Sequence, residues 1–333
     1  MTVESAVAIP KLAAPAQDFA PVLRPKRQKT TASQVMGAML RRVINPVHLW
    51  RAGRLQINRK AHRHTYDDAQ LALYAKIFPG DFLHFGYFEN AELTPDETRL
   101  ADVTRAQIRY AELVLDLAAP NDLPALDVGC GMGGLSRMLL ARGYAPTALT
   151  PDRMQAAHIQ ATMPNVPVIR TKLEKMPTAD YLGRFGTIFT AESLQYLKLD
   201  QALPVLSSVL APGGRWVACD FFHNAPSADR SCHVWDEFTQ KLDQGGWKIS
   251  YQRDITAHVL PTLRYAHMWG ARFGVPLMQF GFLRLRRKAP GLHHLFADAY
   301  DKLESMAKEN LSIIDPDKFS REKQYMLLMM EKK

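Results

Sequence analysis

The sequence predicts an α/β protein with a Rossmann-like, mostly parallel sheet, a helical cap before the sheet and a helical lid inserted near its end. Three observations lead to this prediction. An apolar run ending at Val128 leads into a glycine-rich turn and then a helix-forming stretch at 135–140. Short apolar runs and helical patterns alternate after it, as in βαβ units. The 333 residues are 47% hydrophobic, enough for one large domain with additions.

Residues 1–65 are predicted to form a basic N-terminal arm. They contain twelve Lys and Arg residues against Glu4 and Asp18, and the rest of the chain has a net charge of −1. The arm is expected to be partly disordered, with an amphipathic helix from Ser33 to Ile44 that Pro46 ends. This helix either docks on the folded domain or contacts anionic lipid headgroups or another anionic ligand. An organellar transit peptide is a further alternative.

The predicted location is the cytoplasm, with membrane association through the arm left open. Three cysteines, Cys130, Cys219 and Cys232, have no paired spacing, which suits a reducing compartment and indicates neither disulfides nor a metal site. No apolar run reaches the length of a membrane span. The basic charge lies in the arm, so no nucleic-acid partner is expected. A homodimer is left open.

Residues 66–120 are predicted to form the helical cap. Aromatic residues are frequent from Tyr66 to Phe88, and most of them are expected to pack the cap onto the core. Thr94-Pro-Asp-Glu97 has the pattern of a capping box with proline at the first helical position. A helix is therefore expected from there to about Leu117.

The core is predicted over 121–256, the lid over 257–318 and the last core strand within 319–333. After the first strand, strands are expected at 147–149, 166–169, 187–190, around 210–217, at 247–256 and, fully buried, at 324–330. Between the last two strands, an apolar stripe at Leu292, Leu295, Phe296, Ala299, Leu303 and Met306 indicates a helix. So long an insertion at this place is interpreted as a lid over an acceptor site.

The glycine-rich turn has two interpretations. The spacing Gly129-x-Gly131-x-x-Gly134 satisfies the dinucleotide fingerprint, and Asp152 lies near the distance expected for a ribose-binding acid, so an NAD-dependent oxidoreductase stays open. Asp127, two residues before the first glycine, makes the pattern D-x-G-x-G. This pattern resembles motif I of class I S-adenosylmethionine (SAM) methyltransferases. The resemblance implies a seven-stranded sheet with an antiparallel last strand, and SAM as the cofactor.

Other segments resemble particular methyltransferases. His84-Phe-Gly-Tyr-Phe88 is similar to a segment upstream of the core in tocopherol and sterol methyltransferases and in prenyl diphosphate C-methyltransferases. The stretch from Asp254 to Pro261 resembles a segment of the prenyl and tocopherol enzymes. Thr150 and Gln155 keep the spacing of a ribose-side segment in cyclopropane fatty acid synthases and prenyl C-methyltransferases.

These resemblances imply the residues of the site. The cofactor-binding residues would be Asp127, Gly129, Gly131, Gly133, Thr150, Asp152, Gln155, Leu173, Glu174 and Glu192. Glu192-Ser-Leu-Gln-Tyr196 resembles the N-E-S-x-x-Y segment of prenyl diphosphate C-methyltransferases, whose Glu is the base. The catalytic residues would then be Glu192, Tyr196 and His84, with His84 expected to touch a ligand. For Glu192, binding of the cofactor amine or capping of the next helix stays open.

The predicted function is SAM-dependent methylation of a small amphiphilic, lipid-like acceptor. C-methylation of an isoprenoid or prenyl diphosphate, with Glu192 as base, is the first interpretation. The alternatives are O- or N-methylation of a lipid-like or natural-product acceptor, an NAD-dependent oxidoreductase, and a non-catalytic SAM-fold binding module. Ring closure as in cyclopropane synthases is disfavoured, because Phe85, Gln195 and Tyr196 replace residues that those enzymes need.

Overall fold

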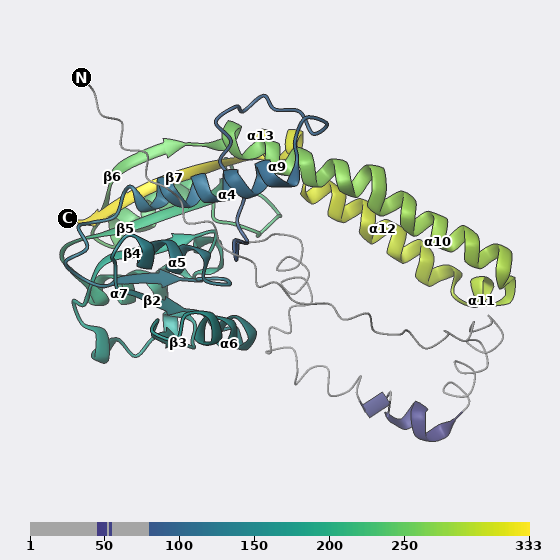
Figure 1. Cartoon of the computed structure of the whole chain (residues 1–333), viewed down its shortest axis with the longest axis horizontal. Helices are drawn as coiled ribbons and strands as arrows, with labels where there is room; N and C mark the ends of the chain where they lie inside the picture. The colour runs from purple at the N-terminus through teal and green to yellow at the C-terminus, as the bar shows by residue number, and fades with distance from the viewer. Residues whose placement is uncertain (1–44, 52, 55–79) are drawn as a thin grey trace, which may run out of the picture. The chain divides into compact units, whose positions relative to one another are not determined.

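The computed structural model describes residues 45–51, 53–54 and 80–333, drawn in colour in Figure 1. The chain divides into two units, and the second begins at Thr65. The predicted helix over 33–44, the cap residues before 80 and most of the predicted N-terminal arm lie outside the described residues. Each unit is described by itself, and the fold below is that of the second one.

In the first unit, Pro46 begins a helical segment, and the helix that it was expected to end lies outside the described residues. The side chain of Asn45 accepts a 2.9 Å hydrogen bond from the amide of Val47 through Oδ1. This is the capping chemistry of a helix start, where proline is tolerated because its missing N–H has no partner to lose.

Seven strands form one sheet in the order β3-β2-β1-β4-β5-β7-β6. β7 runs antiparallel to β5 and β6, and all other neighbouring pairs are parallel. The predicted seven-stranded, mostly parallel sheet is thereby confirmed. The strands are β1 Ala125–Val128, β2 Pro146–Leu149, β3 Val168–Ile169, β4 Phe185–Ala191, β5 Leu210–His223, β6 Trp247–Asp254 and β7 Lys323–Lys332.

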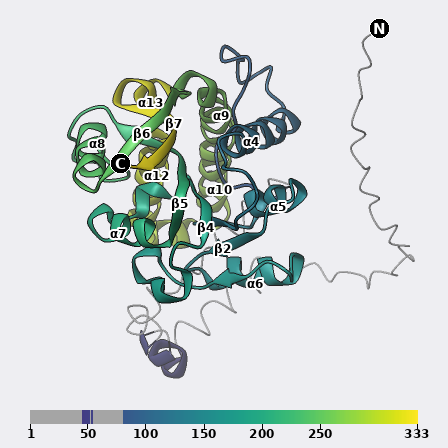
Figure 2. The same cartoon turned by 90° about the vertical axis from the view of Figure 1, so that its left-hand side faces the viewer.

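Helices cover both faces of the sheet. Figure 2 shows α7 (Leu199–Val209) and α8 (Trp235–Gln244) on one side. On the other side lie α4 (Leu100–Leu115), α5 (Gly134–Ala141) and α9 (Thr256–Trp269). α6 (Arg153–Thr162) and α13 (Pro316–Glu322) pack through Ile159 and Phe319 on the same face as α4.

The buried strands explain why the core has two halves. Along β1, Leu126 and Val128 belong to the cluster under α7 and α8, and Ala125 belongs to the cluster under α4 and α5. Successive side chains of a strand point to opposite faces, so a strand with helices on both sides is apolar throughout. Trp216 of β5 packs edge-on against Trp247 of β6 with ring centroids 5.4 Å apart. Each such buried side chain contributes about 1.5–3 kcal/mol.

The helix predicted from the capping box begins later than expected. Only half of the capping box forms: the Thr94 amide donates to Glu97 Oε2 over 3.1 Å, whereas the Glu97 amide donates to the carbonyl of Thr94 and not to its hydroxyl. The segment they cap is only a turn, because Arg99 has an extended backbone (φ −107°, ψ 159°) that interrupts the helical path. α4 therefore begins at Leu100, where Asp102 accepts from the Arg99 amide, and ends at Leu115.

Residues 84–88 form a strap between α4 and α9. The amide of Tyr87 donates to the carbonyl of Ala106 in α4 over 2.8 Å, and that of Phe88 donates to the carbonyl of His258 in α9 over 2.9 Å. A Cβ on Gly86 would lie 2.5 Å from the Cβ of Ala106, so only glycine permits this approach. The two segments that resemble methyltransferase motifs, far apart in sequence, thus lie against each other.

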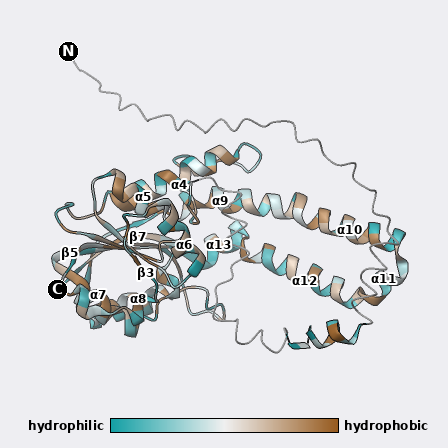
Figure 3. Cartoon of the chain, turned by 60° about the horizontal axis from the view of Figure 1, so that its bottom comes forward, coloured by the Kyte–Doolittle hydropathy of each residue, from teal (hydrophilic) through white to brown (hydrophobic). Residues whose placement is uncertain are grey.

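The insertion between β6 and β7 is helical, as predicted. A π-helical turn (Gly270–Gly274) joins α9 to α10 (Val275–Lys288), and α11 (Pro290–Leu295) leads into α12 (Ala297–Ile313). Figures 1 and 3 show α10 and α12 running side by side away from the sheet. We call residues 275–313 the helical arm. Its apolar stripe at Leu295, Phe296, Leu303 and Met306 is exposed, and its function as a lid stays a prediction.

Candidate functional site

A pocket of about 520 Å³ opens at the carboxyl ends of the central parallel strands. The strand order reverses between β1 and β4, which is where open α/β sheets bind ligands. All predicted site residues except Gly133 line it, namely His84, Asp127, Gly129, Gly131, Thr150, Asp152, Gln155, Leu173, Glu174, Glu192 and Tyr196. No residue of the helical arm is among the lining residues of this pocket.

Each glycine of the turn is required for a different physical reason. Gly129 has φ +70°, and a Cβ there would lie 2.3 Å from the Cβ of Ser193. The hydroxyl of Ser193 donates 2.6 Å to the carbonyl of Val128, so the end of β4 is held directly against the turn. Gly131 has φ +54° and lies in the pocket wall, where a Cβ would meet Leu83 at 3.3 Å. Gly129 is thus required by packing, and Gly131 by conformation and by access to the pocket.

Gly133 does not line the pocket, in contrast to its predicted place at the cofactor. It is the N-cap of α5, with φ +90°. A Cβ would lie 2.5 Å from Cε of Met163, at the end of α6, so contact between the two helices explains this glycine.

Asp127, the acid of the D-x-G-x-G pattern, is buried at the end of β1. Its Oδ2 accepts a 2.6 Å hydrogen bond from the hydroxyl of Ser136 in α5. Burial raises its pKa to about 6, and the hydrogen bond from Ser136 opposes the shift. The carboxyl group therefore ties α5 to β1, and the turn between them is held in shape.

The end of β2 brings three predicted side chains together. The hydroxyl of Thr150 donates to Oε1 of Gln155 over 2.6 Å and accepts from the amide of Asp152 over 3.1 Å. Asp152 caps α6, because its Oδ1 accepts from the amides of Met154 and Gln155. Its Oδ2 is buried and has no hydrogen-bond partner within the described residues. A buried oxygen without a donor is costly, which indicates that a ligand supplies one.

After β3, the chain turns through residues 173–175 at the pocket wall. Leu173 is buried and presents an apolar surface. Glu174 accepts a 3.0 Å hydrogen bond from the amide of Lys198 at the start of α7. That bond occupies Oε1 and orients the carboxylate.

Glu192 follows β4 and has a strained backbone with φ +50°. For a residue other than glycine, this region costs roughly 1–2 kcal/mol. Its Oε1 accepts two hydrogen bonds of 2.6 Å, from the amide of Phe85 in the strap and from the hydroxyl of Tyr325 in β7. Burial raises the pKa of Glu192 to about 7, and these two hydrogen bonds oppose the shift. Near neutral pH the group can therefore exist in either form.

A hydrogen-bonded row continues from Glu192 into the core. The hydroxyl of Tyr325 lies 3.1 Å from that of Tyr110, which donates to the carbonyl of Cys219 over 2.9 Å. Burial raises the pKa of both tyrosines well above the usual range, so both stay protonated. Each hydroxyl has one hydrogen, which Tyr110 donates to Cys219 and Tyr325 donates to Glu192, so no hydrogen lies between the two hydroxyls while Glu192 is a carboxylate. The row thus orients the Tyr325 hydroxyl as a donor to Glu192.

His84 lies in the pocket wall, and its predicted contact with a ligand stays a prediction. Its ring is stacked on Tyr110 with centroids 4.2 Å apart, and Nδ1 donates to the carbonyl of Phe85 over 2.7 Å. Burial lowers the pKa of His84 to about 4, so the ring is neutral at neutral pH. Nε2 is then an acceptor, and it is buried with no partner within the described residues.

Tyr196 lies at the rim of the pocket. It belongs to the 3₁₀ turn Leu194–Tyr196 after β4, and the residue is 76% exposed. A ring at the rim can contact a bound acceptor, and its predicted catalytic role stays a prediction.

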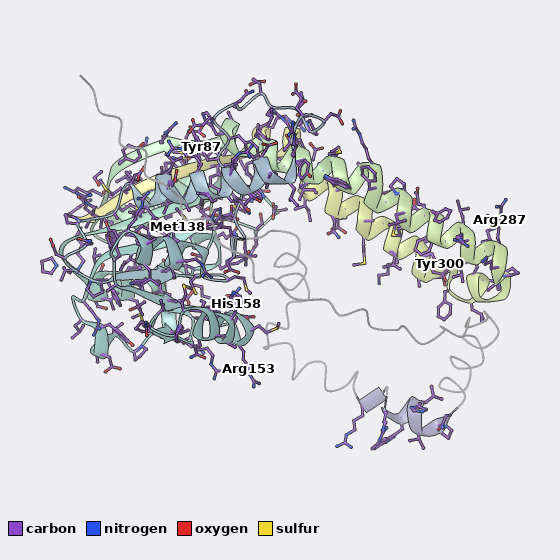
Figure 4. All side chains as sticks on the ribbon, in the orientation of Figure 1. Tyr87, Met138, Arg153, His158, Arg287 and Tyr300 are labelled. Atoms are coloured by element: carbon purple, nitrogen blue, oxygen red, sulfur yellow. The ribbon has the colours of Figure 1, made fainter. Side chains whose placement is uncertain are left out.

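Sequence reasoning missed three parts of the site. Asp81 (φ +63°) lines the pocket, forms an ion pair with Arg137 at 2.5 Å and lies within hydrogen-bond distance, 3.1 Å, of Nε2 of His158. Figure 4 labels His158 on α6. Ser193 and Tyr325 hold the end of β4 from two sides. Of these residues, only Tyr325 could have been found from the sequence. It lies in a strand predicted to be fully buried, where its hydroxyl needs a hydrogen-bond partner.

Two searches of the described residues were negative. Across residues 80–333 and the short segments near 50, no three His, Cys, Asp or Glu side chains are placed to hold a metal ion. Within the same part of the chain, no helix is long and apolar enough to cross a membrane.

Residues 125–214 match the family model described as "Methyltransferase domain". The match confirms the prediction of a methyltransferase domain and, with it, SAM as the cofactor. Two curated relatives are chloroplastic. A tocopherol O-methyltransferase of Arabidopsis thaliana is 28% identical over 180 residues, covering 47% of this chain and 49% of the relative. A probable tocopherol O-methyltransferase of Oryza sativa subsp. japonica is 30% identical over 160 residues, covering 43% and 42%. The chain thus spans about half the length of these relatives.

Solved structures share the fold at low identity. Geranyl diphosphate C-methyltransferase from Streptomyces coelicolor A3(2), in complex with Mg²⁺, geranyl diphosphate and S-adenosyl-L-homocysteine, has a TM-score of 0.54 and 18% identity, covering 83% of this chain and 97% of its own. The cyclopropane synthase MmaA2 from Mycobacterium tuberculosis has a TM-score of 0.54 and 14% identity, covering 80% and 96%. The [4+2]-cyclase SpnF has a TM-score of 0.55 and 19% identity, covering 76% and 89%. These neighbours differ in reaction, so the likeness shows the fold alone.

The residues of the pocket fit SAM. The turn around Gly131 leaves backbone exposed to a ligand, and the volume is within the range of small-molecule sites. The unpartnered Oδ2 of Asp152 suits the hydroxyl groups of a ribose, which are donors. The apolar surface of Leu173 suits a flat base.

Proposed function

We propose that this chain is a SAM-dependent methyltransferase that methylates a carbon of a small amphiphilic acceptor with an alkene, such as an isoprenoid or prenyl diphosphate. The observation that supports this most is Glu192. It is a carboxyl group at the pocket wall, buried enough to raise its pKa to about 7 and held by two hydrogen bonds on one oxygen. A positioned base with such a pKa suits proton removal at neutral pH.

The cofactor is proposed to lie along the ends of β1, β2 and β3. Gly129 and Gly131 would face its methionine end, and Asp152, with Thr150 and Gln155, its ribose. Leu173 and Glu174 would contact the adenine. When bound, SAM supplies an activated methyl group, so the protein contributes alignment, exclusion of water and an acceptor for a proton.

Glu192 is proposed to take up the proton that C-methylation releases. A new carbon–carbon bond at an alkene leaves positive charge on the neighbouring carbon of the acceptor. Loss of a proton from that acceptor restores the double bond. Oε1 of Glu192 is engaged by Phe85 and Tyr325, and no hydrogen bond within the described residues occupies Oε2. We therefore assign proton uptake to Oε2.

The aromatic surroundings divide into two groups. Phe82, His84 and Tyr196 line the pocket, where ring faces can stabilise positive charge on an acceptor. Phe85 packs behind Glu192, with its ring 5.9 Å from that of Tyr325. Phe85 and Tyr325 form the second group, which holds the carboxylate of Glu192 in place.

O-methylation is the second candidate, and the names of the two curated relatives favour it. A hydroxyl acceptor can lose its proton to Glu192 or to water. In that case Glu192 would assist the removal of the proton without being indispensable for it. The main role of the residue, with its strained backbone, would be to join β4 to the strap.

The test is an acceptor screen with radiolabelled SAM, using prenyl diphosphates, sterols, quinone precursors and phospholipids. The expected result is label in an isoprenoid-like product, with the methyl group on carbon by mass spectrometry. Glu192→Gln should then lose turnover by orders of magnitude and keep its affinity for S-adenosyl-L-homocysteine. A fully active Glu192→Gln enzyme refutes C-methylation with this base. Binding of NADH in place of S-adenosyl-L-homocysteine refutes the methyltransferase itself.

A further inference from the structure

The helical arm has no buried residue in either of its long helices. α10 and α12 contact each other along one side, where the rings of Phe282 and Tyr300 lie 4.5 Å apart. A helix of 17 residues such as α12 is about 25 Å long. Most helical stability in proteins comes from packing of an apolar face. Two long helices that lack such burial indicate a surface that another body covers.

The distal turn of the arm exposes large apolar side chains. Leu283 is 59% exposed, Leu295 is 75% exposed and Phe296 is 51% exposed. Figure 4 shows Arg287 and Tyr300 at this end, next to α11. We call residues 283–296 the arm tip.

The arm tip is also basic. Arg284, Arg286, Arg287 and Lys288 occupy the last turns of α10, and the sequence has no Asp or Glu from Val275 to Phe296. No ion pair of the described residues includes any of these four cations. Acidic residues begin again at Asp298, in the first turn of α12.

We propose that the arm tip binds the surface of an anionic lipid bilayer. Exposed leucine and phenylalanine next to a cluster of unpaired cations is the combination that inserts shallowly among anionic headgroups. Each cation near such a surface is attracted to the anionic headgroups, and each apolar side chain that leaves water adds to the binding. Nucleic acid would use the charges and leave the apolar side chains exposed. A second copy of this chain would cover the apolar side chains and bring the cations of two copies together.

The site of binding is separate from the pocket. No residue of the arm tip lines the pocket, so membrane binding leaves the walls of the site unchanged. It would hold the enzyme where lipid-like molecules are concentrated. The inference does not depend on which atom of the acceptor is methylated.

The test is vesicle co-sedimentation of the full chain with amide hydrogen exchange. Phosphatidylcholine vesicles are compared with vesicles containing phosphatidylglycerol, at low and high salt. We expect binding to the anionic vesicles only, weakened by salt, with slower exchange over 283–296. Arg286→Glu/Arg287→Glu/Lys288→Glu should lower the bound fraction at least tenfold. Leu295→Ser/Phe296→Ser should weaken binding with the charges unchanged, and neither variant should alter thermal stability, because these side chains are exposed.

A matched control variant distinguishes vesicle binding by the arm tip from vesicle binding by the basic first unit. Arg51→Glu/Arg54→Glu/Arg59→Glu makes the same charge change there, and it should leave the slowed exchange at the tip in place. The proposal is overturned if this variant abolishes binding and the tip variant does not. It is also overturned if wild-type amides at the tip exchange equally with and without vesicles, or become protected by self-association at high protein concentration alone.

Discussion

The hydroxyl of Tyr325 lies 2.6 Å from Oε1 of Glu192, although 133 positions separate the two residues in sequence. The same oxygen accepts from the Phe85 amide, so β4, β7 and the strap meet at one atom. Burial raises the pKa of Glu192 to about 7 in spite of these two bonds. Desolvation is therefore the larger effect, and the hydrogen bonds limit it.

Tyr325→Phe is expected to raise the pKa of Glu192 further, because it removes one of the hydrogen bonds that favour the carboxylate. The base would then be ionised only at higher pH. With the acceptor found in the screen, the acidic limb of kcat/KM should move to higher pH, and the activity should recover above it. Glu192→Gln should show no such recovery. An unchanged pH profile in Tyr325→Phe would mean that the tyrosine only fills space.

Glu192→Gln is also expected to change stability with pH. The folded pKa of about 7 lies above the ordinary value of a glutamate side chain, 4.5. Below pH 4.5 both states hold the proton, and between about 4.5 and 7 only the folded state does, so folding loses stability as pH rises. The full loss is about 3 kcal/mol above pH 7. Urea unfolding should show that the stability of the variant relative to wild type is higher at pH 8 than at pH 5. A difference that stays constant with pH contradicts the raised pKa.

Gly131→Ala is expected to abolish cofactor binding at small cost to the fold. Its φ of +54° is strained for alanine, and the added Cβ would project into the pocket wall beside Leu83. Gly183→Ala is the control, because Gly183 has φ +55° and open space around it. Both should lose about 1 kcal/mol of stability. Calorimetry with S-adenosyl-L-homocysteine should show normal binding for Gly183→Ala alone, and equal affinity of both variants would remove Gly131 from the site.

Asp152→Asn is expected to weaken cofactor binding about tenfold or more. Oδ1 can still cap α6, but the amide that replaces Oδ2 no longer accepts from a ribose hydroxyl. Asp315→Asn is the matched control, since Asp315 caps α13 in the same way through the amides of Asp317 and Lys318. If calorimetry finds the same affinity in both variants, the unpartnered oxygen has no part in binding.

The sequence predicted most of the sheet and the pocket, because strand ends and glycine turns are local patterns. Thr150, Asp152 and Gln155 lie within six residues of each other, between the end of β2 and the first turn of α6, so they meet locally. Asp127 lies at the end of β1, as its place before the glycine turn predicts. Its partner Ser136 is on the next helix and could be inferred only from structure.

The parts that were missed depend on contacts across the sheet. Tyr325 and Phe85 meet at Glu192 because β7 inserts beside β5 and the strap lies between α4 and α9, which no local pattern encodes. The late start of α4 has a similar origin. The Thr94–Glu97 capping box forms only through the Glu97 side chain, and the extended backbone at Arg99 separates it from the helix.

The position of β7 also governs the order in which the molecule can be assembled. β5 and β6 both pair with β7, so the edge that each of them presents to β7 stays unpaired until the whole segment from Ile255 to Glu322 and β7 itself have been synthesised. Such edges favour aggregation, and closing a long loop is entropically slow. The helices of this segment form from local contacts, and its first and last helices, α9 and α13, pack against each other. The helical arm, with α9 and α13 at its base, thus forms a hairpin that returns the chain to the sheet, where β7 pairs with β5 and β6.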